Sequence, residues 1–280
     1  MRTWFITGIG GGLGRALAEE VSLTGDKVIG TTRSPTGPGW FDAALHPLIH
    51  PVTLDIADEE AVALTVQAAE AEHGPFDVAV NNAGYGLTGA VEETSLYQAR
   101  TLFDVNVWAA LAVIKAVLPA MRRKRGGHII NVTSVSGHAT WGGIGIYSAS
   151  KFALECIGRT LASEVKPLGI KVTNVAPGGL RTGFSGDSLR NVTSSIEDYA
   201  DTAHANRRLL TGHKGREPND PVRAARAILK AANSDTPPLS LLLGADALHY
   251  AGYEQQRLGD EFGQWQALTL STAFEPAKEA

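Results

Sequence analysis

A tyrosine and a lysine four positions apart are candidates for proton-transfer chemistry. Tyr147 and Lys151 stand at the start of a long stretch with apolar residues at helical spacing, so their side chains lie on one face of the expected helix. A free phenol has a pKa of about 10, and a neighbouring ammonium group lowers it by stabilising the phenolate. The pair therefore fits a general acid and base that protonates a carbonyl oxygen during reduction. An ordinary pair on a helix surface is the alternative, because this spacing is common.

Other polar residues are expected near this pair, which favours the catalytic interpretation. Ser134 ends a β-branched run that predicts a buried strand, close to where the helix with Tyr147 starts. Residues 81–84, of sequence Asn-Asn-Ala-Gly, end another such run, and Asn106 lies on the helix that follows. The carboxyl ends of parallel strands meet at one edge of a sheet, where open α/β sheets bind ligands.

A glycine-rich segment follows the first predicted strand and precedes a helix. Glycine permits a positive φ and a close approach of backbone to ligand, and a helix start presents free N–H groups to phosphate. The order of strand, loop and helix therefore predicts a dinucleotide site. A tight turn with a packing role is the alternative. The loop residues concerned are Gly8, Gly10, Gly11, Gly12, Leu13 and Gly14.

The end of the second predicted strand indicates which nucleotide binds. An NAD site has a carboxylate there, which accepts hydrogen bonds from the adenosine ribose. This chain has Thr32 and Arg33 at that place and no acidic residue. Arg33 is a planar, permanent cation and suits the 2′-phosphate of NADP. The sequence therefore predicts NADP(H) in preference to NAD(H); an arginine at a solvated strand end is the alternative.

Short apolar runs alternate with longer stretches of helical periodicity along the chain. The runs are residues 4–7, 27–31, 51–54, 77–81, 128–133, 171–175 and 239–243. Such alternation predicts right-handed crossovers and a parallel sheet covered on both faces. We expect an α/β, doubly wound Rossmann-type fold with about seven parallel strands, formed as a single domain by residues 1–280.

One long segment lacks this alternation of apolar runs and helical periodicity. Residues 183–221 are polar and follow the sixth predicted strand at its carboxyl end. A long segment without strong periodicity inside a compact domain is usually functional or mobile. We expect it to be a substrate-binding lid within the domain, with a solvated insertion as the alternative.

These segments together resemble the short-chain dehydrogenase/reductase family, in its single-domain branch. The glycine pattern from Thr7 to Gly14, the Asn-Asn-Ala-Gly segment and the pair of Tyr147 and Lys151 are similar to the family's cofactor loop, strand motif and catalytic pair. Ser134 stands thirteen positions before Tyr147, as the family's catalytic serine does. The match covers nearly the first 185 residues in the correct order. The resemblance implies an NAD(P)-dependent oxidoreductase that interconverts a ketone and a secondary alcohol by hydride transfer.

The resemblance also implies catalytic roles for four residues. Ser134 hydrogen-bonds the substrate oxygen, and Ser136 is a weaker candidate for that role. Tyr147 transfers the proton. Lys151 lowers the tyrosine pKa and holds the nicotinamide ribose, and Asn106 anchors a water molecule that relays protons to Lys151.

Cofactor contacts implied by the resemblance extend beyond the glycine loop. They are Thr32, Arg33, Asp55, Ile56, Asn82, Ala83, Gly84, Tyr147, Lys151, Pro177, Gly178 and Thr182. For Asp55 and Thr182, helix capping or turn formation is the alternative. Gly11 departs from the pattern of many relatives that use NADP, which have a basic residue there, so Arg33 lacks its usual helper.

The substrate is less determined, because it depends on loops grafted on a shared fold. His138, Trp141 and Phe184 are expected to line a pocket for a fairly apolar ketone or secondary alcohol. Two other functions remain open. The chain could be a non-catalytic dinucleotide-sensing protein, although such proteins commonly lose the tyrosine or lysine. It could also be a sugar-nucleotide epimerase or dehydratase, which normally has a different glycine loop and a larger C-terminal domain.

Composition excludes several classes of partner. The net charge of -4 favours neither nucleic acid nor an acidic membrane surface as a partner, and no uninterrupted apolar run is long enough to span a bilayer. A single cysteine, Cys156, fits a cytoplasmic protein without disulfides, and the eight histidines show no metal-binding spacing, so we expect no metal. The family's long helices usually pair across a two-fold axis, which implies a homodimer or homotetramer.

Overall fold

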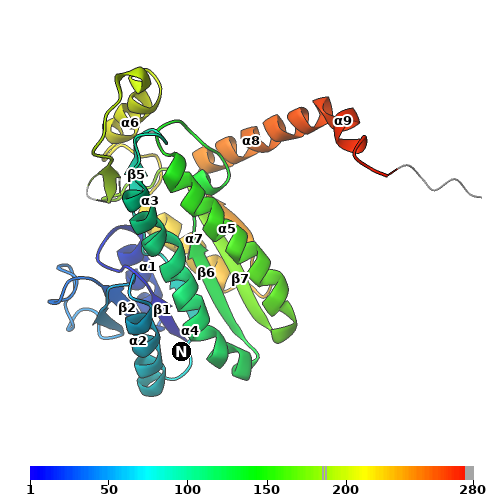
Figure 1. The fold of residues 1–280 in the computed structure, drawn as a ribbon. Helices are drawn as coiled ribbons and strands as arrows, with labels where there is room; N and C mark the ends of the chain where they lie inside the picture. Colours follow the sequence, from blue (N-terminus) through cyan, green and yellow to red (C-terminus); the bar gives the residue numbers. More distant parts are fainter. Residues whose placement is uncertain (185, 187, 275–280) are drawn as a thin grey trace, which may run out of the picture.

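Seven parallel strands form the central sheet of the computed structural model, which describes residues 1–184, 186 and 188–274. The strand order is β3-β2-β1-β4-β6-β7-β9, so the chain starts inside the sheet and winds outward in both directions (Figure 1). The strands are β1 Thr3–Ile6, β2 Lys27–Thr32, β3 Ile49–Thr53, β4 Val78–Asn81, β6 Gly127–Val132, β7 Ile170–Pro177 and β9 Ser240–Leu243. Every neighbouring pair is parallel. This confirms the doubly wound Rossmann-type fold predicted from the sequence.

Helices cover both faces of the sheet because alternate strand residues point to opposite sides. Trp4 and Ile6 of β1 pack against α1 (Gly12–Leu23) and α7 (Pro221–Ala232). Phe5, between them, packs in a second core with three helices on the other face. These helices are α2 Glu59–His73, α4 Ala109–Lys124 and α5 Gly145–Val165. The strands are therefore apolar on both sides, as their continuous hydrophobic runs predicted.

The remaining elements lie mostly around the carboxyl edge of the sheet, toward the top of Figure 1. They are β5 Gly86–Thr88, α3 Leu96–Phe103, the π-helix η1 Asp104–Trp108, the 3-10 helices η2 Val135–Gly137, η3 Lys166–Leu168 and η4 Glu197–Tyr199, β8 Leu189–Asn191, α6 Ala203–Gly212, α8 Ala245–Gln264 and α9 Gln266–Leu270. The carboxyl edge also holds the starts of α1 and α5.

The segment 183–221 contains more regular structure than its sequence predicted. β8 pairs with β5, and α6 contacts the rest of the domain through a buried hydrogen bond between His204 Nε2 and Glu93 Oε1 (2.7 Å). Ser185 and Asp187, which belong to the predicted lid, lie outside the described residues. Helix α6 was missed because it is polar overall and its two leucines, Leu209 and Leu210, are exposed instead of packing in the core.

The elements α3, η1 and α4 form one helical segment, Leu96–Lys124, of 29 residues. By length and composition alone this segment could cross a membrane, and half of its most apolar window is buried inside the protein. Val113, Val117 and Met121 of α4 lie in the core against the sheet. The absence of a membrane partner therefore stays a prediction.

Candidate active site

Tyr147 and Lys151 lie on the first two turns of α5 and are buried together. Lys151 Nζ lies 5.9 Å from the centre of the Tyr147 ring and donates a hydrogen bond to the carbonyl oxygen of Val132, at the end of β6 (3.0 Å). Ser134 comes two residues after that carbonyl and caps η2, and its hydroxyl interacts with the Tyr147 phenol. The structure thus brings the predicted serine, tyrosine and lysine together, and favours Ser134 over Ser136 as the polar partner of the tyrosine.

Asn106 is buried beside these residues, where the π-helix η1 interrupts a longer helix. Its Oδ1 accepts a hydrogen bond from the Tyr85 backbone N–H (3.0 Å), and its Nδ2 donates to the Tyr85 carbonyl (2.9 Å) and to Ser150 Oγ (3.1 Å). A methyl group at Gly84 would lie 3.0 Å from Asn106 Oδ1 and 3.5 Å from Lys151 Nζ. Gly84 therefore leaves room for the Lys151 ammonium group next to Asn106, as the predicted proton relay between Asn106 and Lys151 requires.

Burial sets the pKa values of the two titratable groups. Tyr147 is only 7% exposed, and burial raises the pKa of its phenol to about 12, while the Ser134 hydroxyl acts in the opposite direction. Burial lowers the pKa of the Lys151 ammonium to about 8. In both groups the surroundings disfavour the charged form. In the protein alone, desolvation therefore outweighs the lowering of the tyrosine pKa that the sequence predicted from the neighbouring lysine.

A row of buried asparagines, which the sequence analysis missed, fixes α5 to the sheet. Asn81 Nδ2 donates to Asn131 Oδ1 (2.9 Å), and Asn131 Nδ2 donates to Asn174 Oδ1 (3.0 Å). Asn174 Nδ2 then donates to the carbonyl oxygen of Glu155 on α5 (2.8 Å). The three asparagines occupy one register across β4, β6 and β7. Their position at the end of three predicted strands was a usable signal only once the strand order was known.

The glycine loop has the conformation that a phosphate site needs. Gly8 and Gly12 have φ angles of 76° and 56°, which favour glycine. Gly11 precedes α1 and supplies no side-chain cap, so the first amides of the helix are available to an anionic ligand. A methyl group at Gly12 would lie 3.3 Å from Cβ of Thr182, which places Thr182 against the loop. These features fit the pyrophosphate of a dinucleotide.

Asn82 and Ala83 hold this loop from the neighbouring strand. Their backbone N–H groups donate to Thr7 Oγ1 (2.9 and 3.0 Å). Asn82 Nδ2 donates to the carbonyl oxygens of Thr7 and Gly8 (2.8 and 3.1 Å). The structure therefore shows Asn82 and Ala83 as supports of the glycine loop, next to the place predicted for the cofactor.

The end of β2 brings Thr32 to the glycine loop. A methyl group at Gly10 would lie 3.7 Å from Thr32 Oγ1, and the exposed side chain of Arg33 follows directly. Asp55 Oδ1 accepts a hydrogen bond from the Ala57 N–H (3.1 Å), which is the turn role considered as its alternative. Ile56 beside it is buried. The end of β2 thus has no carboxylate, and the contacts of Thr32, Arg33, Asp55 and Ile56 with an adenosine stay predictions.

A second cation near the loop was not anticipated. The Arg15 guanidinium lies 5.1 Å from the centre of the Trp40 ring, and the Trp40 indole N–H donates to the Ile9 carbonyl oxygen (2.9 Å). The 15–19 spacing also pairs Arg15 with Glu19 at 3.0 Å. The indole thus fastens the loop after β2 to the glycine loop.

The segment after β7 is fixed by α8. Gly178 N donates to the Leu243 carbonyl oxygen (2.9 Å), and the next backbone amide, of Gly179, donates to Asp246 Oδ2 (2.7 Å). Asn219 Nδ2 donates to Asp246 Oδ1 (2.8 Å), which ties the far end of the lid to the same carboxylate. Pro177 and Gly178 therefore lie at the carboxyl edge, at the level of the glycine loop.

The chain matches the family described as short chain dehydrogenase over residues 2–192. The protein belongs to the short-chain dehydrogenase family. It is therefore an oxidoreductase that acts on CH–OH groups with a nicotinamide dinucleotide as cofactor.

Relatives of this short-chain dehydrogenase align over most of its length. The oxidoreductase BOA17 of Botryotinia fuckeliana is 36% identical over 273 residues, 97% of this chain and 99% of that protein. Retinol dehydrogenase 8 of Bos taurus is 34% identical over 256 residues, 85% of this chain and 80% of that protein. A solved short-chain dehydrogenase of Streptomyces avermitilis is 34% identical, covers 98% of both chains and superposes with a TM-score of 0.91. The likeness therefore extends past residue 192 into the lid and the C-terminal helices.

On the substrate side of this dehydrogenase, an apolar cluster surrounds Tyr147. Phe184 of the lid lies 5.8 Å from the Tyr147 ring, measured between ring centres. Trp141 packs at the edge of the same cluster and makes an edge-to-face contact with Tyr250 of α8 at 5.1 Å. The buried members of the cluster are Leu87, Leu102, Ile144, Tyr147 and Val192. Two of the three predicted pocket residues are thus brought to the tyrosine's cluster.

His138, the third, lies against charged residues of α5. Its Nε2 is 3.7 Å from Glu155 Oε2, and its Nδ1 is 3.5 Å from an Arg159 nitrogen. Burial lowers the pKa of His138, and Arg159 acts in the same direction, while Glu155 opposes them. The structure shows His138 as part of this ionic cluster rather than of the apolar one.

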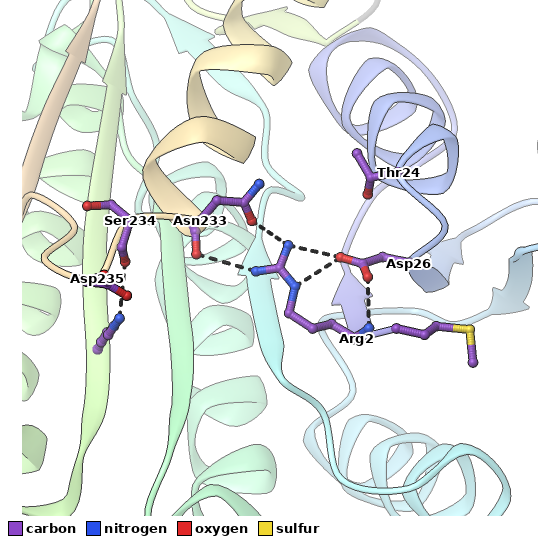
Figure 2. Close-up of a pocket in the computed structure, with 9 residues that line it drawn as sticks. Arg2, Thr24, Asp26, Asn233, Ser234 and Asp235 are labelled. Carbon is purple, nitrogen blue, oxygen red and sulfur yellow. Dashed lines mark hydrogen bonds and ion pairs between the residues drawn. The ribbon is translucent and has the colours of Figure 1, made fainter.

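The hollows on the described surface include two that lie at opposite edges of the sheet. One, of about 380 Å³, is lined by Trp141 together with His249, Tyr250 and Tyr253 of α8. The other, of about 520 Å³, lies at the opposite, amino edge of the sheet, where Arg2 binds Asp26 at 2.9 Å and Asn233 at 2.5 Å (Figure 2). Its side chains are engaged with one another, so we assign it a structural role. Among the described residues no group of three or more His, Cys, Asp or Glu could hold a metal.

Proposed function

We propose that this short-chain dehydrogenase interconverts a fairly apolar ketone and the corresponding secondary alcohol, with Tyr147 as general acid and base and with NADP(H) as the preferred cofactor. The observation that carries the proposal is that the buried side chains of Tyr147, Lys151 and Asn106 gather with the half-buried Ser134 in one cluster beside the glycine loop. The apolar residues around this cluster and the similarity of the chain to a retinol dehydrogenase support an apolar substrate.

The protonation states suit reduction of a ketone. With its pKa raised to about 12, the Tyr147 phenol is protonated at neutral pH and can donate to a developing alkoxide. Ser134 donates a second hydrogen bond to the same oxygen and orients it. A bound nicotinamide supplies the hydride and, once oxidised, a positive charge. Lys151 holds a further positive charge beside the phenol, which stabilises the phenolate until a proton returns through Asn106 and water.

The test of the mechanism is Tyr147→Phe, with Tyr97→Phe as the matched control on the surface. Loss of the hydroxyl removes the proton that the reaction needs, so turnover of ketones should fall below detection while cofactor affinity stays within about a factor of three. A panel of ketones assayed by the absorbance of reduced nicotinamide measures turnover, and fluorescence titration measures affinity. Retention of most of the activity in Tyr147→Phe would refute the proposed acid.

The cofactor preference rests on Arg33 and on the lack of a carboxylate at the end of β2. A charge-assisted bond to a 2′-phosphate contributes roughly 1.5–3 kcal/mol, or about one to two powers of ten in affinity. Since Gly11 supplies no second cation, we expect the smaller preference, with residual use of NAD(H). The test compares kcat/KM for both cofactors in the parent and in Arg33→Asp. A parent that favours NAD(H), or an unchanged preference in the variant, would show that Arg33 does not bind the phosphate.

Access to Tyr147 requires the lid to move, because Phe184 and Val192 pack in the cluster that covers the phenol. We therefore retain the lid role proposed for residues 183–221. We also propose that the protein self-associates through the long helices, since Tyr97 and Trp108 near α3 and Phe152 on α5 are exposed. A cytoplasmic location and the lack of nucleic-acid partners remain part of the proposal.

A further inference from the structure

The C-terminal arm, residues 252–274, has an apolar face that the body of the protein does not cover. Within the described chain α8 buries only Ala247 and Ala251, and Figure 1 shows the rest of α8 and α9 running away from the body. Phe262, Trp265 and Leu268 are 68%, 59% and 62% exposed. Large apolar side chains gathered on one exposed element mark an interaction surface.

The arm also needs a partner in order to be helical. It contains Gly252, Gly259 and Gly263, each of which weakens a helix, and a free helix of about this length is marginal in water. Leu258, Phe262 and Trp265 are four and three residues apart and form one stripe. A short helix with several glycines is stabilised mainly when such an apolar stripe packs against another surface. The arm thus has the pattern of a docked helix.

The charge of the arm indicates what it docks against. It has three acidic residues, Glu254, Asp260 and Glu261, and one basic residue, Arg257. A helix that lies on a membrane usually has lysine and arginine on its polar face, so an acidic arm does not suit an anionic lipid surface. Its complement is a surface with exposed apolar groups and an excess of positive charge.

Helix α6 and the turn after it provide such a surface on the same chain. Residues 203–216, here called the basic ridge, contain four lysine or arginine residues and no acidic residue. Leu209 and Leu210 on the ridge are exposed, and the inner side of α6 contacts the body through the hydrogen bond between His204 and Glu93. The ridge therefore presents apolar groups among cations.

We propose that the C-terminal arm of one copy docks on the basic ridge of a second copy, and that the two arms exchange around a two-fold axis. In Figure 1 the arm extends away from the ridge of its own chain, so the two surfaces meet only between copies. A two-fold arrangement buries both arms and both ridges at once. This interface is separate from the one proposed for the long helices, and it places the arm of each copy on the lid of the other.

Crosslinking tests the contact directly. In a Cys156→Ser background, a tagged Leu209→Cys protein is mixed with an untagged Leu268→Cys protein and treated with a short bismaleimide. We expect a tagged covalent species of twice the 29.5 kDa chain mass, in several-fold higher yield than from Leu45→Cys mixed with Leu268→Cys. Leu45 is the matched control, because it lies on a loop after β2 and is at least as exposed as Leu209. Equal yields from the two mixtures would overturn the proposal.

Charge exchange tests its specificity. Arg208→Glu on the ridge should reduce the yield several-fold, and Asp260→Lys on the arm should restore it in the same mixture, with circular dichroism confirming that the variants are folded. Failure of the second change to restore the yield would count against the ridge as the docking site. Sedimentation of the uncrosslinked protein with phosphatidylcholine vesicles addresses the lipid alternative: binding to vesicles that is lost with Phe262→Glu, together with no crosslink, would overturn docking between copies.

Discussion

Two glycines of the same loop should respond oppositely to one added methyl group. A methyl at Gly14 would overlap the carbonyl oxygen of Gly8 and lie 2.5 Å from Asn82 Nδ2 and 3.0 Å from the Gly8 carbonyl carbon. Two of these three atoms belong to the backbone, and the amide of Asn82 is held by two hydrogen bonds, so no neighbour can move cheaply. At Gly11, a methyl group would meet no described atom within 4 Å.

The size of the effect follows from overpacking. Inserting a methyl into a filled site costs roughly 1–3 kcal/mol, and a clash with fixed backbone belongs at the upper end. For a chain of this size, about 3 kcal/mol lowers Tm by roughly 6–12 °C. Gly14→Ala should also weaken NADPH binding at least tenfold, because α1 must shift away from the loop that its first amides complete.

Gly11→Ala is the matched control. Its φ of -178° is open to any residue and the position is unobstructed, so Tm should change by less than about 2 °C. Thermal unfolding and fluorescence titration of both variants provide the measurements. Equal loss of Tm in the two variants, or an unchanged Tm in Gly14→Ala, would refute the packing described for the glycine loop.

Three further predictions concern charged groups. Lys151→Met should abolish turnover yet raise the free energy of unfolding at pH 7 by roughly 1–3 kcal/mol, because the pKa of this lysine is 10.5 in the unfolded chain and about 8 in the folded protein. The buried lysine therefore destabilises the fold fully below pH 8, and this effect disappears as the pH rises toward 10.5, which urea unfolding at pH 7 and pH 10 can check. Asp26→Asn should lower the free energy of unfolding by roughly 1–3 kcal/mol at pH 7. Burial alone would raise the pKa of Asp26, but hydrogen bonds from the Arg2 amide, the Trp4 indole and the Arg2 guanidinium lower it, so the stabilisation by Asp26 is present above its ordinary pKa of 3.8 and is lost as the pH falls through the lowered pKa. Glu93→Gln should speed proteolysis between β8 and α6 several-fold and leave the rest of the chain resistant, because hydrogen bonds from the Ile196 amide, the Ala90 amide and His204 stabilise the Glu93 carboxylate and lower its pKa to about 2. Equal cleavage of parent and variant would show that this carboxylate does not hold the lid in place.

The sheet and the catalytic cluster could be predicted from sequence because both leave local signals. Strands buried on two faces form continuous apolar runs, and all seven appeared within a few residues of their observed bounds. Ser134 directly follows β6, and Tyr147 and Lys151 lie in the first two turns of the next long helix, α5, so the connection from β6 to α5 brings them together. The glycine loop was visible because glycine at Gly8 and Gly12 is required by the backbone itself.

Long-range polar contacts left no such signal. The asparagine row depends on which strands become neighbours, and Asp246 reaches the segment after β7 across 67 positions of chain. His138 was placed in the substrate pocket because it lies between Ser134 and Tyr147, but its neighbour Glu155, 3.7 Å away, is known only from the packing of α5. The lid helix α6 was missed because it is polar along most of its length and buries only Ala203 and His204.

The burial of Tyr147 connects the chemistry to the choice of substrate. Its phenol stays protonated at neutral pH because burial raises its pKa to about 12, so in the proposed mechanism the protein itself holds the proton that the ketone oxygen takes up as hydride reaches the carbon. Oxidation of an alcohol needs the phenolate, and the Lys151 charge stabilises it more strongly when water is excluded. The lid residue Phe184 and its apolar neighbours exclude that water. In the proposed mechanism the same side chains select an apolar substrate and set the pKa of the acid, so we expect that opening the cluster changes substrate preference and the pH profile together.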